Sequence, residues 1–194
     1  AYVIKDYDGV KVAFVGVTTP KTITSSTPKY FQDENGNFVY GFCQDDSGEK
    51  LYTAVQTAVD AARAEGANYV VLMAHLGIEA ECSPWMSTEV IANTTGIDAV
   101  LDGHSHSVLP QEKVLNKDGT EVLLAACGTK LENIGVLRID TEGALSTKLY
   151  SWACDESATE LFGLTGTVAD AVKAATADLD ETLSQVVAKT AVDL

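Results

Sequence analysis

Three histidines, all that this 194-residue sequence contains, follow short apolar runs. His75 comes directly after the run over 69–74, and His104 and His106 follow the run over 99–101 after a glycine. Apolar runs of this length, rich in β-branched residues, predict buried strands. Open α/β sheets bind ligands beyond the carboxyl ends of their strands, and neutral imidazole is a common ligand of zinc, copper, nickel and iron. Because every histidine lies at such a strand end, the sequence predicts a metal site there.

Strands and helices alternate through the first hundred residues. The pattern predicts a strand over 10–17, a helix over 51–62 that ends at Gly66, a strand over 69–74, a helix from Ser83-Pro84 to about Ala92, and a strand over 98–101. A capping box is expected over 46–49, before the first helix. This order is typical of a parallel α/β sheet with right-handed crossovers.

The second part of the chain has a different pattern. Hairpins are expected over 113–126 and 134–152, each with a glycine-containing turn, and a polar linker over 153–166. A final helix is expected to carry an apolar face from Val168 to Leu179. We therefore expect one domain over 1–152, followed by a linker and helix over 153–194.

Residues 18–49 are expected to form a long loop with five aromatic side chains. A loop of this length in a compact domain usually has a function or wraps the surface. We expect its aromatic side chains to fix the loop to the body of the domain rather than to bind a ligand.

The formal net charge of −15, from 28 acidic and 13 basic residues, argues against a nucleic-acid polymer as partner. An anionic substrate would need local positive charge, which bound cations supply. No apolar run approaches the length of a membrane span. The four cysteines include no C-x-x-C pair, so they leave the redox compartment open.

Several motifs together resemble the calcineurin-like metallophosphoesterases. They are the strand and His-Leu-Gly over 72–77, Gly-Ile-Asp over 96–98 and Gly-His-Ser-His over 103–106. The segments 9–20 and 87–92 resemble most closely the bacterial branch of 5′-nucleotidases and 2′,3′-cyclic-nucleotide phosphodiesterases. The resemblance extends over roughly residues 8–140, and the ending over 186–194 resembles the linker to that branch's substrate domain.

This resemblance implies a four-layer α/β/β/α sandwich with two divalent ions, such as zinc or manganese. His75 and His104 would bind one ion and His106 the other. The ions would hold a nucleotide phosphate and activate the water that attacks phosphorus. The resemblance also implies a location outside the cytoplasm, in the periplasm, the cell wall or the extracellular space.

The sequence departs from the family at its beginning. The family's Asp-x-His, Gly-Asp and Asn-His motifs precede the segment at Val10, whereas no histidine precedes His75 here. We therefore expect the second half of a phosphoesterase domain, whose partners are the missing N-terminal half and a C-terminal substrate domain. No catalytic residue is assigned. The isolated chain is expected to be inactive and to bind at most one ion, weakly.

Two other kinds of protein remain open at this point. One is a structural zinc protein whose ligands are the three histidines and Cys82, since a closed shell of four ligands suits zinc without catalysis. The other is a metal-free interaction module in which the histidines make hydrogen bonds only.

Overall fold

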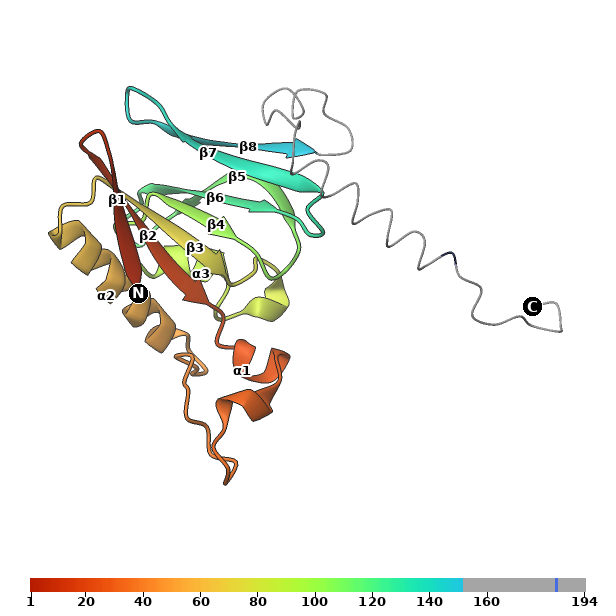
Figure 1. Ribbon diagram of the computed structural model, residues 1–194. Coiled ribbons are helices and arrows are strands. Elements are labelled where there is room, and N and C mark those ends of the chain that lie inside the picture. Colours follow the sequence, from red (N-terminus) through yellow and green to blue (C-terminus); the bar gives the residue numbers. More distant parts are fainter. Residues whose placement is uncertain (152–183, 185–194) are drawn as a thin grey trace. The chain divides into compact units, whose positions relative to one another are not determined.

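The computed structural model describes residues 1–151 and Ser184, and Figure 1 shows a mixed α/β arrangement around one large sheet. The strands of this sheet are β1 (Tyr2–Tyr7), β2 (Val10–Thr18), β3 (Tyr69–His75), β4 (Ala99–Asp102), β5 (Val108–Leu115) and β6 (Glu121–Cys127). A separate hairpin consists of β7 (Asn133–Ile139) and β8 (Leu145–Ser151). The helical elements are α1 (Thr22–Ser25), η1 (Pro28–Phe31), α2 (Glu49–Ala64), η2 (Ala80–Cys82) and α3 (Ser87–Ala92). The linker and helix expected after residue 152 lie outside the described residues.

The six-stranded sheet has the order β1-β2-β3-β4-β6-β5. Its four central strands are parallel, and the edge strands β1 and β5 are antiparallel to their neighbours. The register places Leu72 opposite both Val15 and Val100, so the three strands predicted to carry or flank the histidines lie side by side. The predicted α/β class and both hairpins are confirmed.

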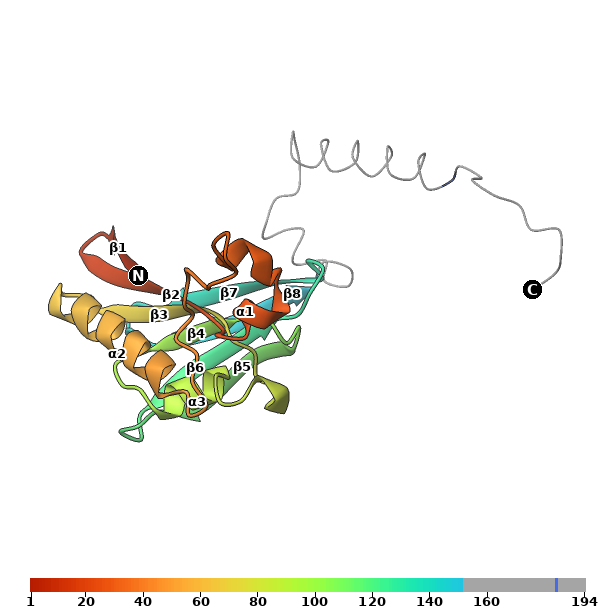
Figure 2. The ribbon, with the colours of Figure 1, turned by 90° about the horizontal axis from the view of Figure 1, so that it is seen from below.

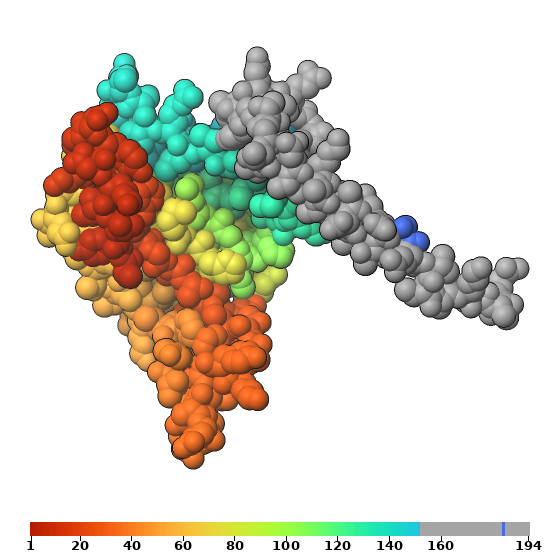
Figure 3. Space-filling view, in the orientation of Figure 1, coloured from red at the N-terminus to blue at the C-terminus, as the bar shows by residue number. Residues whose placement is uncertain are grey.

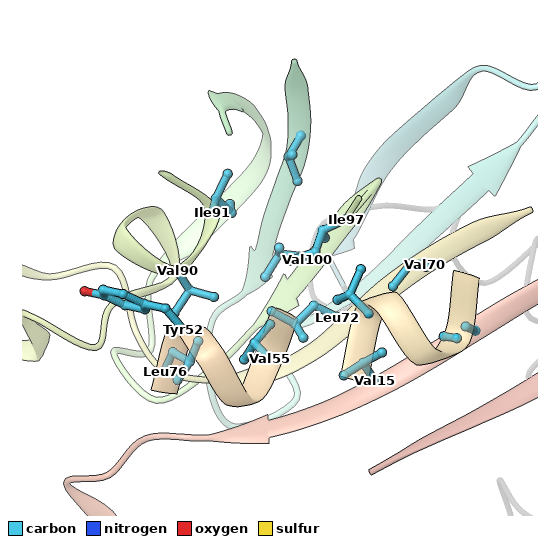
Figure 4. Packing of buried hydrophobic residues seen from close by; sticks show 14 of the residues in the cluster. Val15, Tyr52, Val55, Val70, Leu72, Leu76, Val90, Ile91, Ile97 and Val100 are labelled. Carbon is cyan, nitrogen blue, oxygen red and sulfur yellow. The ribbon is translucent and has the colours of Figure 1, made fainter. Parts of the chain in front are cut away.

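The main core lies between one face of the sheet and the helices α2 and α3, which are neighbours on that face (Figure 2). Strand residues alternate between the two faces, and Val15, Leu72 and Val100 point into this core (Figure 4). They pack with Val55 and Val59 from α2. Burying each such side chain contributes about 1.5–3 kcal/mol to folding, so this face holds the sheet and its helices together.

The opposite face of the sheet is only partly covered. The hairpin β7–β8 lies on the side away from α2 (Figure 1) and packs Leu137 and Leu145 against a small cluster around Ala99. Beside it runs a groove of about 760 Å³, whose lining includes Phe14 and Met73. Met73 is 45% exposed even though the three residues before it in β3 are fully buried. This face therefore presents apolar side chains to solvent.

Two predictions about how the helices begin are wrong: the first residue of α3 and the cap of α2. The second helix begins at Ser87 rather than at Pro84, because η2 and a turn precede it and the Ser87 amide donates to the carbonyl of Gly77 at 2.9 Å. The carboxylate that caps α2 belongs to Asp45, not to a capping box over 46–49. It accepts hydrogen bonds from the amides of Gly48 at 2.7 Å and Lys50 at 3.1 Å.

The loop expected over 18–49 contains two short helical turns, α1 and η1, and projects from the rest of the described body (Figure 3). Phe31 and Phe42 pack edge to face with ring centroids 5.1 Å apart. Tyr30, Phe38 and Tyr40 are exposed by 78%, 51% and 62%. The prediction that the aromatic side chains fix the loop to the body is therefore wrong for these three. Among the described residues, no helix has the length and apolar character that a membrane crossing requires.

Candidate metal centre

His75 is the last residue of β3, and β3 ends on the same side of the sheet as its parallel neighbours β2 and β4. Figure 1 shows these three strands running in one direction. The position of His75 in the sheet is opposite Thr18 of β2. The His75 carbonyl accepts a hydrogen bond from the Thr19 amide at 2.9 Å, which extends the pairing of the two strands by one residue. The backbone of His75 is therefore fixed by the sheet, although its side chain is exposed.

His104 and His106 lie on the loop that follows β4, and both have positive φ angles, 79° and 57°. This left-handed region is uncommon for residues other than glycine, although histidine adopts it more often than most. Holding such residues costs of order 1–3 kcal/mol each, and this kind of strain clusters at functional sites. The alternation of left-handed residues turns the chain tightly enough for His104 to face back toward β3.

The structure brings His75 and His104 together. Nδ1 of His104 lies 3.2 Å from Nε2 of His75, and the ring centroids are 5.0 Å apart. Two nitrogens bound to one zinc ion at about 2.1 Å each lie roughly 3.4 Å apart in tetrahedral geometry. The separation and the donor type therefore fit two ligands of a single ion. Burial lowers the pKa of His104, and the charges of His75 and Lys21 lower it further, which favours the neutral imidazole.

The other two predicted ligands do not complete this pair. His106 is exposed, and Cys82 is 3% exposed with a thiol pKa that burial raises. Within the part of the chain that the structure describes, no group of three or more His, Cys, Asp or Glu side chains is arranged to hold a metal ion. The pair of His75 and His104 is thus the part of the predicted site that the fold assembles.

A buried carboxylate connects the two loops that carry these histidines. Asp102, the last residue of β4, is 8% exposed and accepts hydrogen bonds from the amides of Leu76 at 2.9 Å and Gly77 at 3.3 Å. It also accepts from the amide of Gly103 at 2.7 Å and from the hydroxyl of Ser87 at 2.6 Å. One side chain therefore joins the end of β3, the end of β4 and the start of α3.

A second set of hydrogen bonds, made by side-chain hydroxyls, joins the loop after β3 to the loop after β4. The Ile78 amide donates to Oγ of Ser105 at 3.2 Å, and Oγ of Ser105 lies 2.8 Å from Oγ of Ser107. The Ser107 hydroxyl donates to Glu79 at 2.8 Å. The residues on both sides of His106 are therefore tied to the loop that follows His75.

Gly77 is required by this packing. Its φ is +84°, and a Cβ there would lie 2.6 Å from Sγ of Cys82 and 3.3 Å from the ring of His104. We expect Gly77→Ala to lower the free energy of unfolding by about 2 kcal/mol, since it adds backbone strain to a clash. Gly16→Ala is the matched control, because a Cβ at Gly16 meets nothing within 4 Å. Urea denaturation of both variants measures the difference, and equal midpoints would contradict it.

Sequence reasoning found the histidines but not the supporting residues. It did not place Asp102 in the site, and it missed Ser87 because the predicted helix began three residues too early. A signal was present for Asp102, since an acidic residue that ends an otherwise apolar run is rarely buried without donors around it. Asp98, just before the same run, lies at the end of the strand remote from the histidines, where it pairs with Arg63 at 2.6 Å.

Comparisons with known proteins agree with this fold. The family model of the bacterial capsule synthesis protein PGA_cap matches residues 1–127. The trifunctional nucleotide phosphoesterase YfkN of Bacillus subtilis is 27% identical over 125 residues, which is 64% of this chain. The 5′-nucleotidase precursor of Thermus thermophilus superposes over 97% of the chain with a TM-score of 0.65 and 22% identity. The sulfate thiohydrolase SoxB of Thermus thermophilus superposes over 78% with a TM-score of 0.57 and 26% identity.

These relatives are much longer than the chain. It covers 7% of YfkN, 36% of the Thermus nucleotidase and 24% of SoxB. The matched family, the shared fold and the motifs around the histidines lead to the same assignment. The chain belongs to the PGA_cap family, in the group of calcineurin-like metallophosphoesterases that includes the bacterial 5′-nucleotidases.

Proposed function

We propose that this chain supplies part of the metal centre of a longer hydrolase that cleaves phosphoric esters of nucleotides. The observation that supports this most directly is the 3.2 Å separation between the facing nitrogens of His75 and His104 at the carboxyl end of a parallel sheet. The names of two relatives, a nucleotide phosphoesterase and a 5′-nucleotidase, support the substrate class. A 5′-monophosphate and a 2′,3′-cyclic nucleotide are both substrates of the proposed type.

In the proposed centre, His75 and His104 hold one divalent ion and His106 holds a second. Such ions lower the pKa of a bound water and neutralise the negative charge of a phosphate. The chain's own contribution is to present imidazoles from two loops whose backbones are fixed by β3, β4 and their hydrogen bonds. Bound cations would also offset the net charge of −15, which by itself repels a phosphate.

We further propose that residues 1–152 are the second half of a phosphoesterase domain and that 153–194 lead to a substrate domain. The uncovered sheet face and its groove of about 760 Å³ support this, since apolar surface of this kind is usually covered by another layer. A hairpin by itself is marginally stable, so further strands beside β7–β8 would complete a four-layer sandwich. By analogy with a nucleotidase precursor, the enzyme would work outside the cytoplasm.

The test is release of phosphate from nucleotides in the presence of manganese or zinc. The isolated chain is expected to be inactive, because the described residues place no carboxylate with the histidine pair to hold two ions together. A longer chain from the same reading frame, containing the preceding half-domain, is expected to turn over, and His75→Asn in it should reduce kcat/KM by more than about 1,000-fold. Metal-dependent release of phosphate by the isolated chain, lost in its His75→Asn variant, would contradict the half-domain proposal.

Comparing substrates distinguishes the proposed cleavage of nucleotide phosphoric esters from cleavage of a sulfur ester. The assay compares a 5′-monophosphate, a 2′,3′-cyclic nucleotide and a sulfur ester of the kind that the SoxB name implies. Turnover of the sulfur ester alone, by the longer chain, would exclude the nucleotide proposal while leaving the metal centre in place.

A further inference from the structure

We infer that Asp102 is a positioning residue that sets the separation between His75 and His104. The inference rests on the proposed metal centre, because it assigns a cause to the ligand spacing on which that centre depends. Asp102 makes no hydrogen bond to either imidazole. It acts through the backbone, by fixing the two loops from which the imidazoles project.

The hydrogen bonds of Asp102 cross the gap between the two histidine loops. Oδ1 accepts from the amides of Leu76 and Gly77, the two residues that follow His75, at 2.9 and 3.3 Å. The same oxygen accepts from the amide of Gly103, the residue that precedes His104, at 2.7 Å. One atom thus holds the residues next to both ligands, so its position fixes where each loop leaves its strand.

The second carboxylate oxygen anchors this arrangement to a helix. Oδ2 accepts from the hydroxyl of Ser87 at 2.6 Å, and Ser87 is fully buried at the first turn of α3. The Ser87 amide donates to the carbonyl of Gly77. Ser87 therefore binds the loop after β3 directly through its amide and indirectly, through Asp102, by its hydroxyl. Since Asp102 is 8% exposed, these bonds are shielded from competing water.

Burying a carboxylate costs free energy unless donors surround it. The described residues offer Asp102 no ion pair, so three amides and one hydroxyl are its stabilising partners. A carboxylate serves this purpose well, because each oxygen accepts more than one hydrogen bond and its charge strengthens them. Gly77, whose amide is one of these donors, also leaves room for the ring of His104, which a Cβ there would approach to 3.3 Å.

Asp98, at the other end of the same segment, provides a matched comparison. Its Oδ2 accepts from the Val70 amide and from Arg63, each at 2.6 Å. It therefore links β3 to the residue before β4 in the same way, but at the end of the strands remote from the histidines. Loss of either carboxylate weakens the β3–β4 connection, whereas only loss of Asp102 should change the ligand spacing.

Zinc titration calorimetry of the chain tests this with Asp102→Ala, Asp102→Asn and Asp98→Ala. Asp102→Ala is expected to weaken zinc binding by about 10- to 100-fold, as losses of partners outside the ligand shell do. Asp102→Asn keeps an oxygen for the amides and an NH₂ group that can donate to Ser87, so it should restore most of the affinity. Asp98→Ala should lower the unfolding midpoint but leave the zinc affinity within about threefold.

A second readout does not involve metal. In the metal-free chain, the rings of His75 and His104 are close enough for nuclear Overhauser effects between their protons, with centroids 5.0 Å apart. Asp102→Ala is expected to remove these effects, and Asp98→Ala to keep them. If Asp102→Ala fails to fold, Ser87→Ala should weaken zinc binding by about tenfold through loss of one hydrogen bond to a charged carboxylate.

The outcomes separate the two proposals. Unchanged zinc affinity and unchanged ring contacts in Asp102→Ala, or in Ser87→Ala where it is used instead, would overturn the role of Asp102 and leave the metal centre intact. Ring contacts that depend on Asp102, in a chain that binds no zinc, would support the positioning role and contradict the proposed metal centre. An equal effect of Asp98→Ala would reduce Asp102 to a general stabiliser and overturn the inference.

Discussion

Replacing His104 with asparagine is expected to abolish the zinc binding that we propose for the isolated chain. In this proposal two facing nitrogens, 3.2 Å apart, would provide the affinity, and one imidazole alone would retain little of it. We expect a loss of at least about 100-fold, since each ligand of a protein zinc site contributes a few kcal/mol. Asparagine is chosen because it tolerates the φ of +79° at this position, so the ligand is removed while the backbone is kept.

The matched control for this experiment is His106→Asn, which also replaces a left-handed histidine. His106 is exposed and lies outside the facing pair, so its loss should change the affinity of the first site by less than about threefold. Titration calorimetry with zinc measures both variants. Two tight sites per wild-type chain, or equal losses in the two variants, would contradict this account of the centre.

Leu72→Ala is expected to be the most destabilising single change in the sheet. Leu72 is fully buried between β2, β4 and α2, and removing its side chain leaves a cavity that the neighbouring side chains fill only partly. The expected loss in the free energy of unfolding is about 3–5 kcal/mol, a large share of the stability of a small domain. Denaturation monitored by far-ultraviolet circular dichroism measures it, provided that the variant still folds at low temperature.

Met73→Ala is the matched control, because Met73 is the next residue along β3 and points to the uncovered face. We expect it to cost less than about 1 kcal/mol in the isolated chain. In a longer chain whose additional layer covers this face, the same substitution should cost about 2–4 kcal/mol. Equal costs of the two substitutions in the isolated chain would show that the two faces are equally buried.

The predictable part of this fold is the part that local pattern determines. The parallel strands were predicted because continuous β-branched runs require burial on both faces, and the hairpins because their turns contain glycine. The edge strand β1 was missed because Lys5 and Asp6 interrupt its apolar pattern, and its place in the sheet comes from pairing with β2. The start of α3 was misplaced because a contact with Gly77, distant in sequence, decides it.

In the candidate site, too, local sequence pattern predicts one part, and contacts between residues distant in sequence decide the other. Residue types and strand ends were sufficient to predict His75 and His104 as neighbours. Their spacing depends on left-handed backbone angles and on a carboxylate with four donors from three elements, none of which local pattern reveals. His106 remains a predicted ligand, and the described residues do not place it with the other two.

The order of strands in the sheet also bears on how the protein emerges from the ribosome. Strands β1, β2, β3 and β4 lie beside one another in the order in which they are synthesised, and β5 and β6 then add as a hairpin with β6 against β4. Because domains begin to fold from the N-terminal side during synthesis, each new strand meets an edge that already exists. Among the strands of this sheet, none would therefore have to be inserted between two that had already paired. Both histidine loops would be complete only when β6 had docked, so the ligand pair would be among the last features of this sheet to form.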